Sequence, residues 1–181
     1  MPLKRKSEPS THDILTERLR LAWVREDMLR ALIVGSAGFQ ELTGWPVAEA
    51  YVDFPGALEY SLDQWETGAA DPRYWMYLIV LENQVIGLIG YKGGPAQSSD
   101  STVEIGYSIA PEHQNHGYAT EAAGALVKNA AGNPSITGVL ACTLGEPNAS
   151  CRVLEKNGFR KIGEIADPDE GTIWKWRVSL R

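Results

Sequence analysis

The chain has 181 residues, a hydrophobic fraction of 44% and a formal net charge of −6 at pH 7. This length and composition predict one globular domain, and the acidic balance argues against nucleic acid as a partner because phosphate backbones attract basic surfaces. The sequence has no apolar run of membrane-spanning length and no secretory signal, so no membrane partner is expected.

Charge and cysteine usage both bear on where the protein works. The two cysteines, Cys142 and Cys151, form no C-x-x-C pair and no disulfide framework, which fits a reducing compartment. We therefore expect a cytoplasmic protein. The acids are concentrated in residues 31–72, which contain seven of them and no lysine or arginine.

The N-terminal stretch, residues 1–13, is polar, contains two prolines and lacks periodicity, so it is predicted to be a mobile tail. Residues 14–181 would then form the single domain. Alternating polarity over residues 15–24 predicts a first strand. Glu26 and Asp27 follow, and because acids favour the first turn of a helix, a helix is expected to start there.

A second helix is predicted after the Pro55-Gly56 turn. Leu58, Leu62 and Trp65 would share its buried face, beside a stripe of acids. These acids are Glu59, Asp63 and Glu66. The stripe is either an acidic rim that attracts a cationic amine or a solvated helix face.

Two apolar runs, residues 74–80 and 85–91, predict strands joined by the turn 81–84. A loop rich in glycine and serine follows. Residues 103–109 then alternate in polarity, which predicts another strand that extends the antiparallel meander.

The strand at 103–109 ends at Pro111, and Gly117 opens a helix in which small and apolar residues recur every three or four positions. Residues 136–144 predict a strand parallel to the first one, connected by a right-handed crossover. The chain closes with a short helix and a hairpin, predicted at residues 148–157, 159–165 and 172–178.

Three segments resemble one known family. Residues 114–119, QNHGYA, are similar to the Q/R-x-x-G-x-G/A loop of the GNAT superfamily, the acyl-CoA-dependent N-acyltransferases. Residues 149–159 resemble its later N-x-x-S-x-x-V-L-E-K-x-G-F segment, and residues 16–21, TERLRL, resemble the first strand of its ribosomal-protein N-acetyltransferase (Rim-type) branch. The resemblance covers residues 15–180.

This resemblance implies a mixed α/β fold with a central, mostly antiparallel, splayed sheet flanked by helices. It also implies transfer of the acetyl group of acetyl-CoA, the co-substrate, directly to a primary amine. The acceptor would be a protein N-terminus or a small amine, and a homodimer is compatible with the family. The alternative is a sensor module that binds acyl-CoA without useful turnover.

The helix that opens at Gly117 presents backbone N–H groups without intrahelical partners, and such a terminus suits phosphate. In the family, these amides hold the CoA pyrophosphate, the pantetheine pairs along the preceding strand, and a main-chain N–H near a bulge in that strand receives the oxyanion. The resemblance thus assigns cofactor contacts to Ile109, Ala110, Gln114, Asn115, His116, Gly117, Tyr118, Ala119 and Thr120.

Glu104 is the candidate general base, acting directly or through a water, because a carboxylate at a sheet cleft can take a proton from an amine. The family's ribosomal-protein branch resembles this Glu-Ile-Gly-Tyr sequence. Alternatively, Glu104 lies on the solvated face of its strand or pairs with a lysine. Packing is the expected role of Tyr107.

Ser150 is the candidate acid, because the resemblance places it at the serine of the N-x-x-S pattern, where it would donate a hydrogen bond to the departing thiolate. Asn148 is a candidate contact for CoA or substrate, although it lies one residue nearer to Ser150 than the pattern requires. For both residues the alternative is capping of the short helix.

Glu112, His113 and His116 lie close together in the sequence and are residue types that bind metals. No H-E-x-x-H motif and no cysteine ligand set accompanies them, so no metal is expected.

Overall fold

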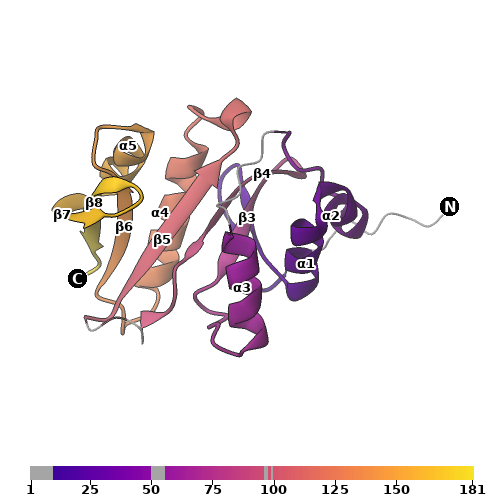
Figure 1. The fold of residues 1–181 in the computed structure, drawn as a ribbon, viewed down its shortest axis with the longest axis horizontal. Helices are drawn as coiled ribbons and strands as arrows, with labels where there is room; N and C mark the ends of the chain where they lie inside the picture. The colour runs from indigo at the N-terminus through magenta and orange to yellow at the C-terminus, as the bar shows by residue number, and fades with distance from the viewer. Residues whose placement is uncertain (1–9, 50–55, 96–97, 99) are drawn as a thin grey trace.

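The computed structural model describes residues 10–49, 56–95, 98 and 100–181. These residues form five α-helices and one eight-stranded sheet with the order β1-β2-β3-β4-β5-β6-β8-β7. The helices are α1 (Glu26–Val34), α2 (Ser36–Thr43), α3 (Ala57–Glu66), α4 (Tyr118–Ala131) and α5 (Ala149–Lys156). The strands are β1 (Ile14–Leu15), β2 (Arg20–Trp23), β3 (Met76–Leu81), β4 (Gln84–Tyr91), β5 (Thr102–Ile109), β6 (Gly138–Leu144), β7 (Arg160–Asp167) and β8 (Gly171–Ser179). The predicted fold class, a mixed and mostly antiparallel sheet flanked by helices, is confirmed (Figure 1).

The packed part of the chain starts earlier than predicted. Asp13, the last residue of the predicted tail, has a buried side chain that accepts a hydrogen bond from Arg20 Nε at 2.7 Å. The same carboxylate accepts from the backbone N–H of Trp23 at 2.9 Å. Asp13 therefore belongs to the domain, whereas residues 1–9 of the predicted tail lie outside the described residues.

The single strand predicted over residues 15–24 is wrong, because this stretch forms the β1–β2 hairpin. The Thr16 N–H donates to the Leu19 carbonyl at 2.9 Å, and the Thr16 hydroxyl accepts from the Leu19 N–H at 3.0 Å. These two bonds reverse the chain between β1 and β2, a tertiary detail that alternation of polarity does not reveal.

Helices α1, α2 and α3 gather on one side of the N-terminal half of the sheet (Figure 1). The helices predicted after Arg25 and after Gly56 are confirmed. Leu29 and Leu58 are buried, and Leu62 and Trp65 pack against the same core, as their helical spacing predicts. No helix in the described part of the chain is long and apolar enough to cross a membrane.

The hairpin predicted over residues 74–91 is also confirmed, as β3 and β4. Glu82 and Asn83 both have positive φ, 47° and 71°, which is the conformation of a two-residue type I′ turn. This turn matches the right-handed twist of the strands that it joins.

The predicted β-α-β unit consists of β5, α4 and β6, and its two strands are parallel as expected. Helix α4 lies behind β5 in Figure 1. The buried stripe of α4 consists of Ala122, Ala123, Leu126 and Ala130. These mostly small side chains let the helix axis approach the sheet closely.

Strands β5 and β6 pair only over their first residues, from the Thr102–Gly138 position to the Glu104–Leu140 position. Beyond that point they separate, and α5 follows β6 on the far side of the gap (Figure 1). The β7–β8 hairpin then completes the sheet beside β6. The splayed sheet is therefore open at its centre.

Candidate functional site

One edge of β5 faces the gap. The Glu104 carbonyl accepts a hydrogen bond from the Lys92 N–H at 2.8 Å. The Ala110 N–H donates to the Ile86 carbonyl at 2.8 Å. Both residues thus direct backbone groups toward β4. Because these groups alternate sides along a strand, the backbone N–H and C=O groups of the intervening odd-numbered residues point toward the gap between β5 and β6. These residues are Ile105, Tyr107 and Ile109.

This alternation separates the two predicted pantetheine contacts. Ile109 faces the gap, and its carbonyl also accepts from Gln114 Nε2 at 2.9 Å. Ala110 turns its N–H to β4 and its carbonyl to the His113 N–H at 2.8 Å. The bulge expected near Ile109 is not found, since the β4–β5 register runs without a shift from Ile109 back to Ile105.

The loop between β5 and α4 surrounds the helix N-terminus. Asn115 and Gly117 have positive φ, 63° and 83°, and turn the chain into α4. A cavity of about 350 Å³ adjoins this loop. Seven of the predicted cofactor contacts line it: Ile109, Gln114, Asn115, Gly117, Tyr118, Ala119 and Thr120. The cavity therefore lies where the first turn of α4 has N–H groups without helical partners.

His116 is the predicted loop contact that is not among the residues lining this cavity. Its ring stacks on Tyr118 with a centroid distance of 5.7 Å. Its carbonyl accepts from the Arg18 guanidinium at 3.0 Å. Within the described chain, no group of three or more His, Cys, Asp or Glu side chains is arranged to hold a metal ion.

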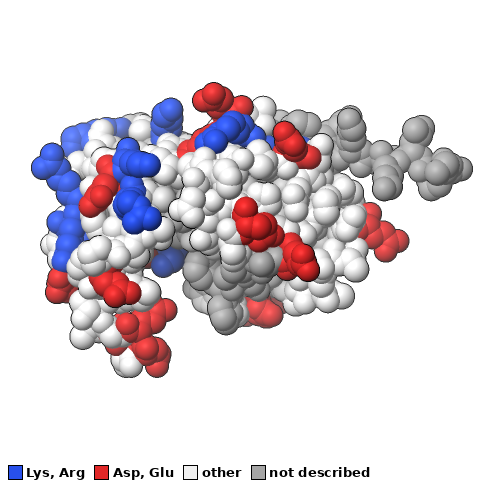
Figure 2. All heavy atoms as spheres, turned by 90° about the horizontal axis from the view of Figure 1, so that it is seen from above, with Lys and Arg blue, Asp and Glu red and all other residues white. Residues whose placement is uncertain are grey.

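Arg152 and Lys156 also line the small cavity, although the sequence analysis did not single them out. They lie four residues apart on α5, so their side chains share one helix face. Figure 2 shows Lys and Arg gathered over the end of the molecule that carries α5, β7 and β8. The cavity thus combines a helix N-terminus with two cations, a combination that suits an anion. The signal that could have revealed these residues is the basic i, i+4 pair.

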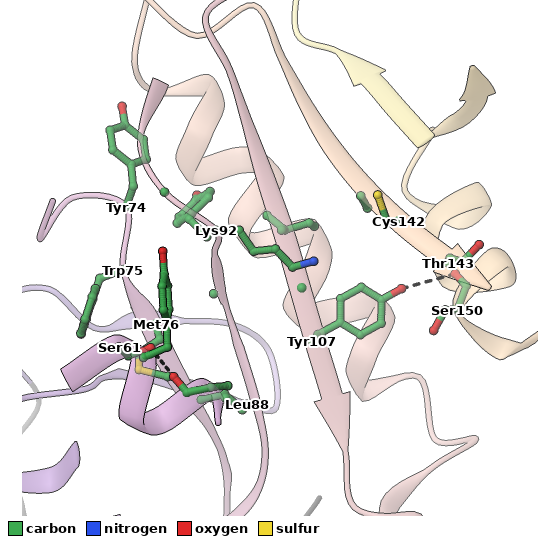
Figure 3. A pocket seen from close by; sticks show the side chains of 18 of the residues that line it. Ser61, Tyr74, Trp75, Met76, Leu88, Lys92, Tyr107, Cys142, Thr143 and Ser150 are labelled. Atoms are coloured by element: carbon green, nitrogen blue, oxygen red, sulfur yellow. Dashed lines mark hydrogen bonds between the residues drawn. The ribbon is translucent and has the colours of Figure 1, made fainter. Parts of the chain in front are cut away.

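A second cavity, of about 890 Å³, lies between α3 and the sheet and reaches β6, α5 and the start of β8 (Figure 3). Its size is in the range of small-molecule sites. Most of its described lining is apolar or aromatic, and the side chains include Trp75, Met76, Leu88, Tyr107, Leu144 and Ile173.

The acidic stripe of α3 is not part of this cavity. Helix α3 contributes Tyr60, Ser61 and Gln64 to the lining. The acids Glu59, Asp63 and Glu66 are exposed and are not among the described lining residues. The three acids therefore lie on a solvated face of α3, one of the two alternatives, and do not form the described wall of this cavity.

The two cavities meet at one wall. Tyr107, Ala149 and Ser150 line both of them. The Tyr107 hydroxyl donates to the Ser150 carbonyl at 3.3 Å, across the gap between β5 and α5 (Figure 3). Burial raises the pKa of Tyr107 to about 12, so its phenol stays protonated near neutral pH and can act as a hydrogen-bond donor.

Asn148 and Ser150 have different positions at the start of α5. Asn148 is the N-cap, since its Oδ1 accepts from the Cys151 N–H at 3.1 Å. Its Nδ2 donates to the Glu146 carbonyl at 3.0 Å, and the residue lines the large cavity only. Asn148 is therefore the residue that caps α5, and Ser150 lies at the wall common to both cavities.

Glu104 pairs with Lys92, at 2.9 Å between its Oε1 and the lysine Nζ. Lysine pairing was one alternative considered for this residue. Glu104 is not among the residues that line either cavity, although its side chain is 30% exposed. It lies beside Cys142 of the large cavity, and burial together with this carboxylate raises the pKa of the Cys142 thiol.

The comparisons with known proteins converge on one family. The sequence profile of the acetyltransferase (GNAT) domain matches residues 18–160. Among solved structures, the chain is similar to a GNAT-family acetyltransferase from Bacillus anthracis, with 21% identity, a TM-score of 0.64, and 93% of this chain and 98% of that chain covered. No curated protein matches the sequence.

Two further similar structures have names that state what the protein acetylates. One is RimL, the ribosomal L7/L12 alpha-N-protein acetyltransferase, in complex with coenzyme A, with 18% identity, a TM-score of 0.66, and 92% of this chain and 97% of that chain covered. The other is a spermidine N-acetyltransferase, a chimera of SpeG from Vibrio cholerae and hSSAT, with 14% identity, a TM-score of 0.66, and 91% and 96% covered. At these identities the solved structures show a common fold.

Proposed function

The chain belongs to the GNAT acetyltransferase family, and on this premise we propose that it transfers the acetyl group of acetyl-CoA to a primary amine where its two cavities meet. The observation that carries the proposal is the wall common to both cavities, formed by Tyr107, Ala149 and Ser150. A donor in the small cavity and an acceptor in the large one would come together there.

The small cavity fits the phosphate-bearing end of CoA. The loop at 114–117 and the first turn of α4 offer backbone N–H groups, and Arg152 and Lys156 add positive charge. The gap-facing edge of β5 offers backbone groups at Tyr107 and Ile109, which suits the amide-containing pantetheine. CoA therefore has candidate contacts for its phosphates and for its pantetheine.

In the transfer, the amine nitrogen forms a bond to the thioester carbonyl carbon and the carbon–sulfur bond breaks. The amine must lose a proton and the thiolate must gain one. We propose Glu104 as the base, acting through a water, and Ser150 as the donor to the thiolate. An N–H on the gap-facing edge of β5, near Ile109, would stabilise the oxyanion.

The acceptor is proposed to be a protein N-terminus or a small amine. RimL is an alpha-N-protein acetyltransferase and the SpeG chimera acts on spermidine, as their names state. An α-amine, with an ordinary pKa near 8, is about one-tenth unprotonated at neutral pH, whereas lysine is almost entirely protonated. A modest base therefore suffices for an α-amine. A cytoplasmic location and a homodimer stay predictions.

The test is acceptor-dependent release of free CoA thiol. The purified protein is titrated with acetyl-CoA by calorimetry, and the same preparation is screened against N-terminal peptides and small amines. Binding followed by acceptor-dependent thiol release is the expected result. Binding without release across the panel would favour the acyl-CoA sensor, and absence of binding would overturn the assignment of the small cavity.

A further inference from the structure

The large cavity contains a cation in an unusual setting. Lys92 follows the last residue of β4, and its side chain lies across β5 at Gly106. A Cβ atom built on Gly106 would lie 3.1 Å from Lys92 Cε. In Figure 3 the ammonium group reaches past β5 toward the strand that carries Cys142. The absence of a side chain at Gly106 therefore lets Lys92 lie over the strand, next to Tyr107.

Glu104 forms an ion pair with this ammonium group. Its Oε1 lies 2.9 Å from Lys92 Nζ, and the Lys92 side chain is 60% exposed and lines the cavity. A lysine ammonium has three N–H donors, and one carboxylate oxygen uses one of them. Lys92 can therefore keep its bond to Glu104 and still donate to a ligand in the cavity.

Lys92 is the single lysine or arginine among the described residues that line this cavity. Of the two acids in the lining, Asp71 is paired with Arg73 at 2.8 Å. Glu170 lies in the turn between β7 and β8. Most of the remaining lining is apolar or aromatic, so a ligand that fills the cavity would itself displace water from beside Lys92, which strengthens a charged contact.

We propose that the acceptor is an amine with an apolar body that also carries an anionic group, in the simplest case a carboxylate, and that Lys92 binds this group. The inference rests on the proposed function of the same site. Gly106, over which Lys92 lies, directly precedes Tyr107 of the common wall, and Lys92, Gly106 and Tyr107 all line the large cavity. The anionic group and the amine of such an acceptor would therefore occupy the same cavity.

Two matched pairs of amines test the proposal and distinguish a small acceptor from a peptide. In the first pair, 4-(aminomethyl)benzoate is compared with 4-(aminomethyl)benzamide. In the second pair, the C-terminally amidated dipeptide Leu-Asp is compared with Leu-Asn. The two members of each pair differ in charge and are nearly identical in shape. Binding of each amine to the CoA-saturated protein is measured by calorimetry.

The expected result is that the anionic member of at least one pair binds about tenfold more tightly than its neutral partner, as a charge-assisted hydrogen bond provides. Lys92→Gln should abolish this preference and Lys92→Arg should retain it. Lys128→Gln, on exposed α4 surface behind the sheet, is the matched control and should leave the preference unchanged.

Equal binding of the two members of both pairs, or no binding of either anionic amine, would overturn the proposal. An equal loss of affinity for both members of a pair in Lys92→Gln would also overturn it. Thiol release from acetyl-CoA is measured separately, so the two hypotheses fail in different ways. A binding preference without release would contradict the transferase alone, and release without preference would contradict the role of Lys92 alone.

Discussion

Glu121 holds Arg18 against the loop that opens α4. Arg18 Nε donates to Glu121 Oε2 at 2.7 Å, and the Arg18 backbone N–H donates to Oε1 at 2.8 Å. The Thr16 hydroxyl adds a third bond to Oε1 at 2.6 Å. The Arg18 guanidinium lies over the Tyr118 ring, 4.7 Å from its centroid. The β1–β2 turn is thereby fastened to the first turn of α4.

Neither Arg18 nor Glu121 is among the described residues that line the small cavity, so their effect on CoA would be indirect. Arg18→Ala is expected to weaken CoA binding about fivefold, because the loop loses the guanidinium that holds the His116 carbonyl. Calorimetry with CoA measures the change. Arg30→Ala removes two exposed ion pairs instead, with Glu26 of α1 and Glu66 of α3, and should leave CoA affinity unchanged. Unaltered CoA affinity in Arg18→Ala would refute the bracing role.

The pKa of the Glu121 carboxylate predicts that the stability of the fold depends on pH. Burial alone would raise the pKa of Glu121, but the hydrogen bonds from Thr16 and Arg18 outweigh it and hold the pKa below its usual value. A lowered folded-state pKa stabilises the fold above the unfolded-state pKa of about 4.3, and this contribution is lost as the pH falls through the folded-state value.

Glu121→Gln should therefore be less stable than the parent chain at pH 7, and the difference should shrink below about pH 4. Urea unfolding of both proteins at several pH values measures it. Other carboxylates titrate in both proteins, so the difference isolates Glu121. A difference that stays constant with pH would show that Glu121 acts only through packing.

Local patterns in the sequence predicted the elements whose features lie within one segment. The apolar stripe of α4 and the turn at Glu82-Asn83 are examples, because helix periodicity and turn chemistry are encoded by neighbouring residues. The β1–β2 hairpin was missed, since the turn between its short strands is stabilised by backbone and side-chain bonds between Thr16 and Leu19 that alternation of polarity does not reveal.

The cavities depend on contacts between distant segments, which the sequence alone does not specify. Helical spacing placed Glu59, Asp63 and Glu66 on one stripe, but only the packing of α3 shows that Tyr60, Ser61 and Gln64 face the cavity. Likewise, the position of Lys92 over Gly106 requires the β4–β5 register. The loop that lines the small cavity is contiguous in the sequence, so its residues could be named together from one motif.

Gly117 and Gly158 allow a matched comparison, since both have left-handed φ values, 83° and 79°. An alanine at either position costs about 1 kcal/mol because its Cβ disfavours this conformation. Gly117→Ala should also weaken CoA binding about tenfold or more, since its Cβ would lie 3.4 Å from Arg18 Nη2, on the loop that is proposed to hold phosphate. Gly158→Ala, beyond the end of α5, should lower stability by a similar amount and leave CoA affinity unchanged. Equal CoA affinities in the two variants would argue against close approach of a ligand at Gly117.

Ser150 and Asn148 provide a second comparison, between chemistry and capping. Asn148→Ala should lower the free energy of unfolding by about 1 kcal/mol, because it removes the N-cap bond to Cys151. Ser150→Ala should leave the thermal midpoint nearly unchanged and reduce kcat at least tenfold, because the leaving thiolate loses a donor. Turnover within about threefold of the parent value would remove Ser150 from the proposed chemistry.

Glu104→Gln distinguishes a base from a group that merely orients Lys92. The glutamine keeps the shape and can still accept a hydrogen bond from Lys92, but it cannot take a proton. If Glu104 is the base, kcat falls at least tenfold with an α-amine acceptor, the rise of kcat with pH is altered, and CoA affinity is unchanged. Steady-state rates from pH 6 to 9 and CoA calorimetry measure these quantities. An unchanged pH profile, with a higher KM confined to anionic acceptors, would instead assign Glu104 to the positioning of Lys92, because only binding of the acceptor anion would then depend on their 2.9 Å ion pair.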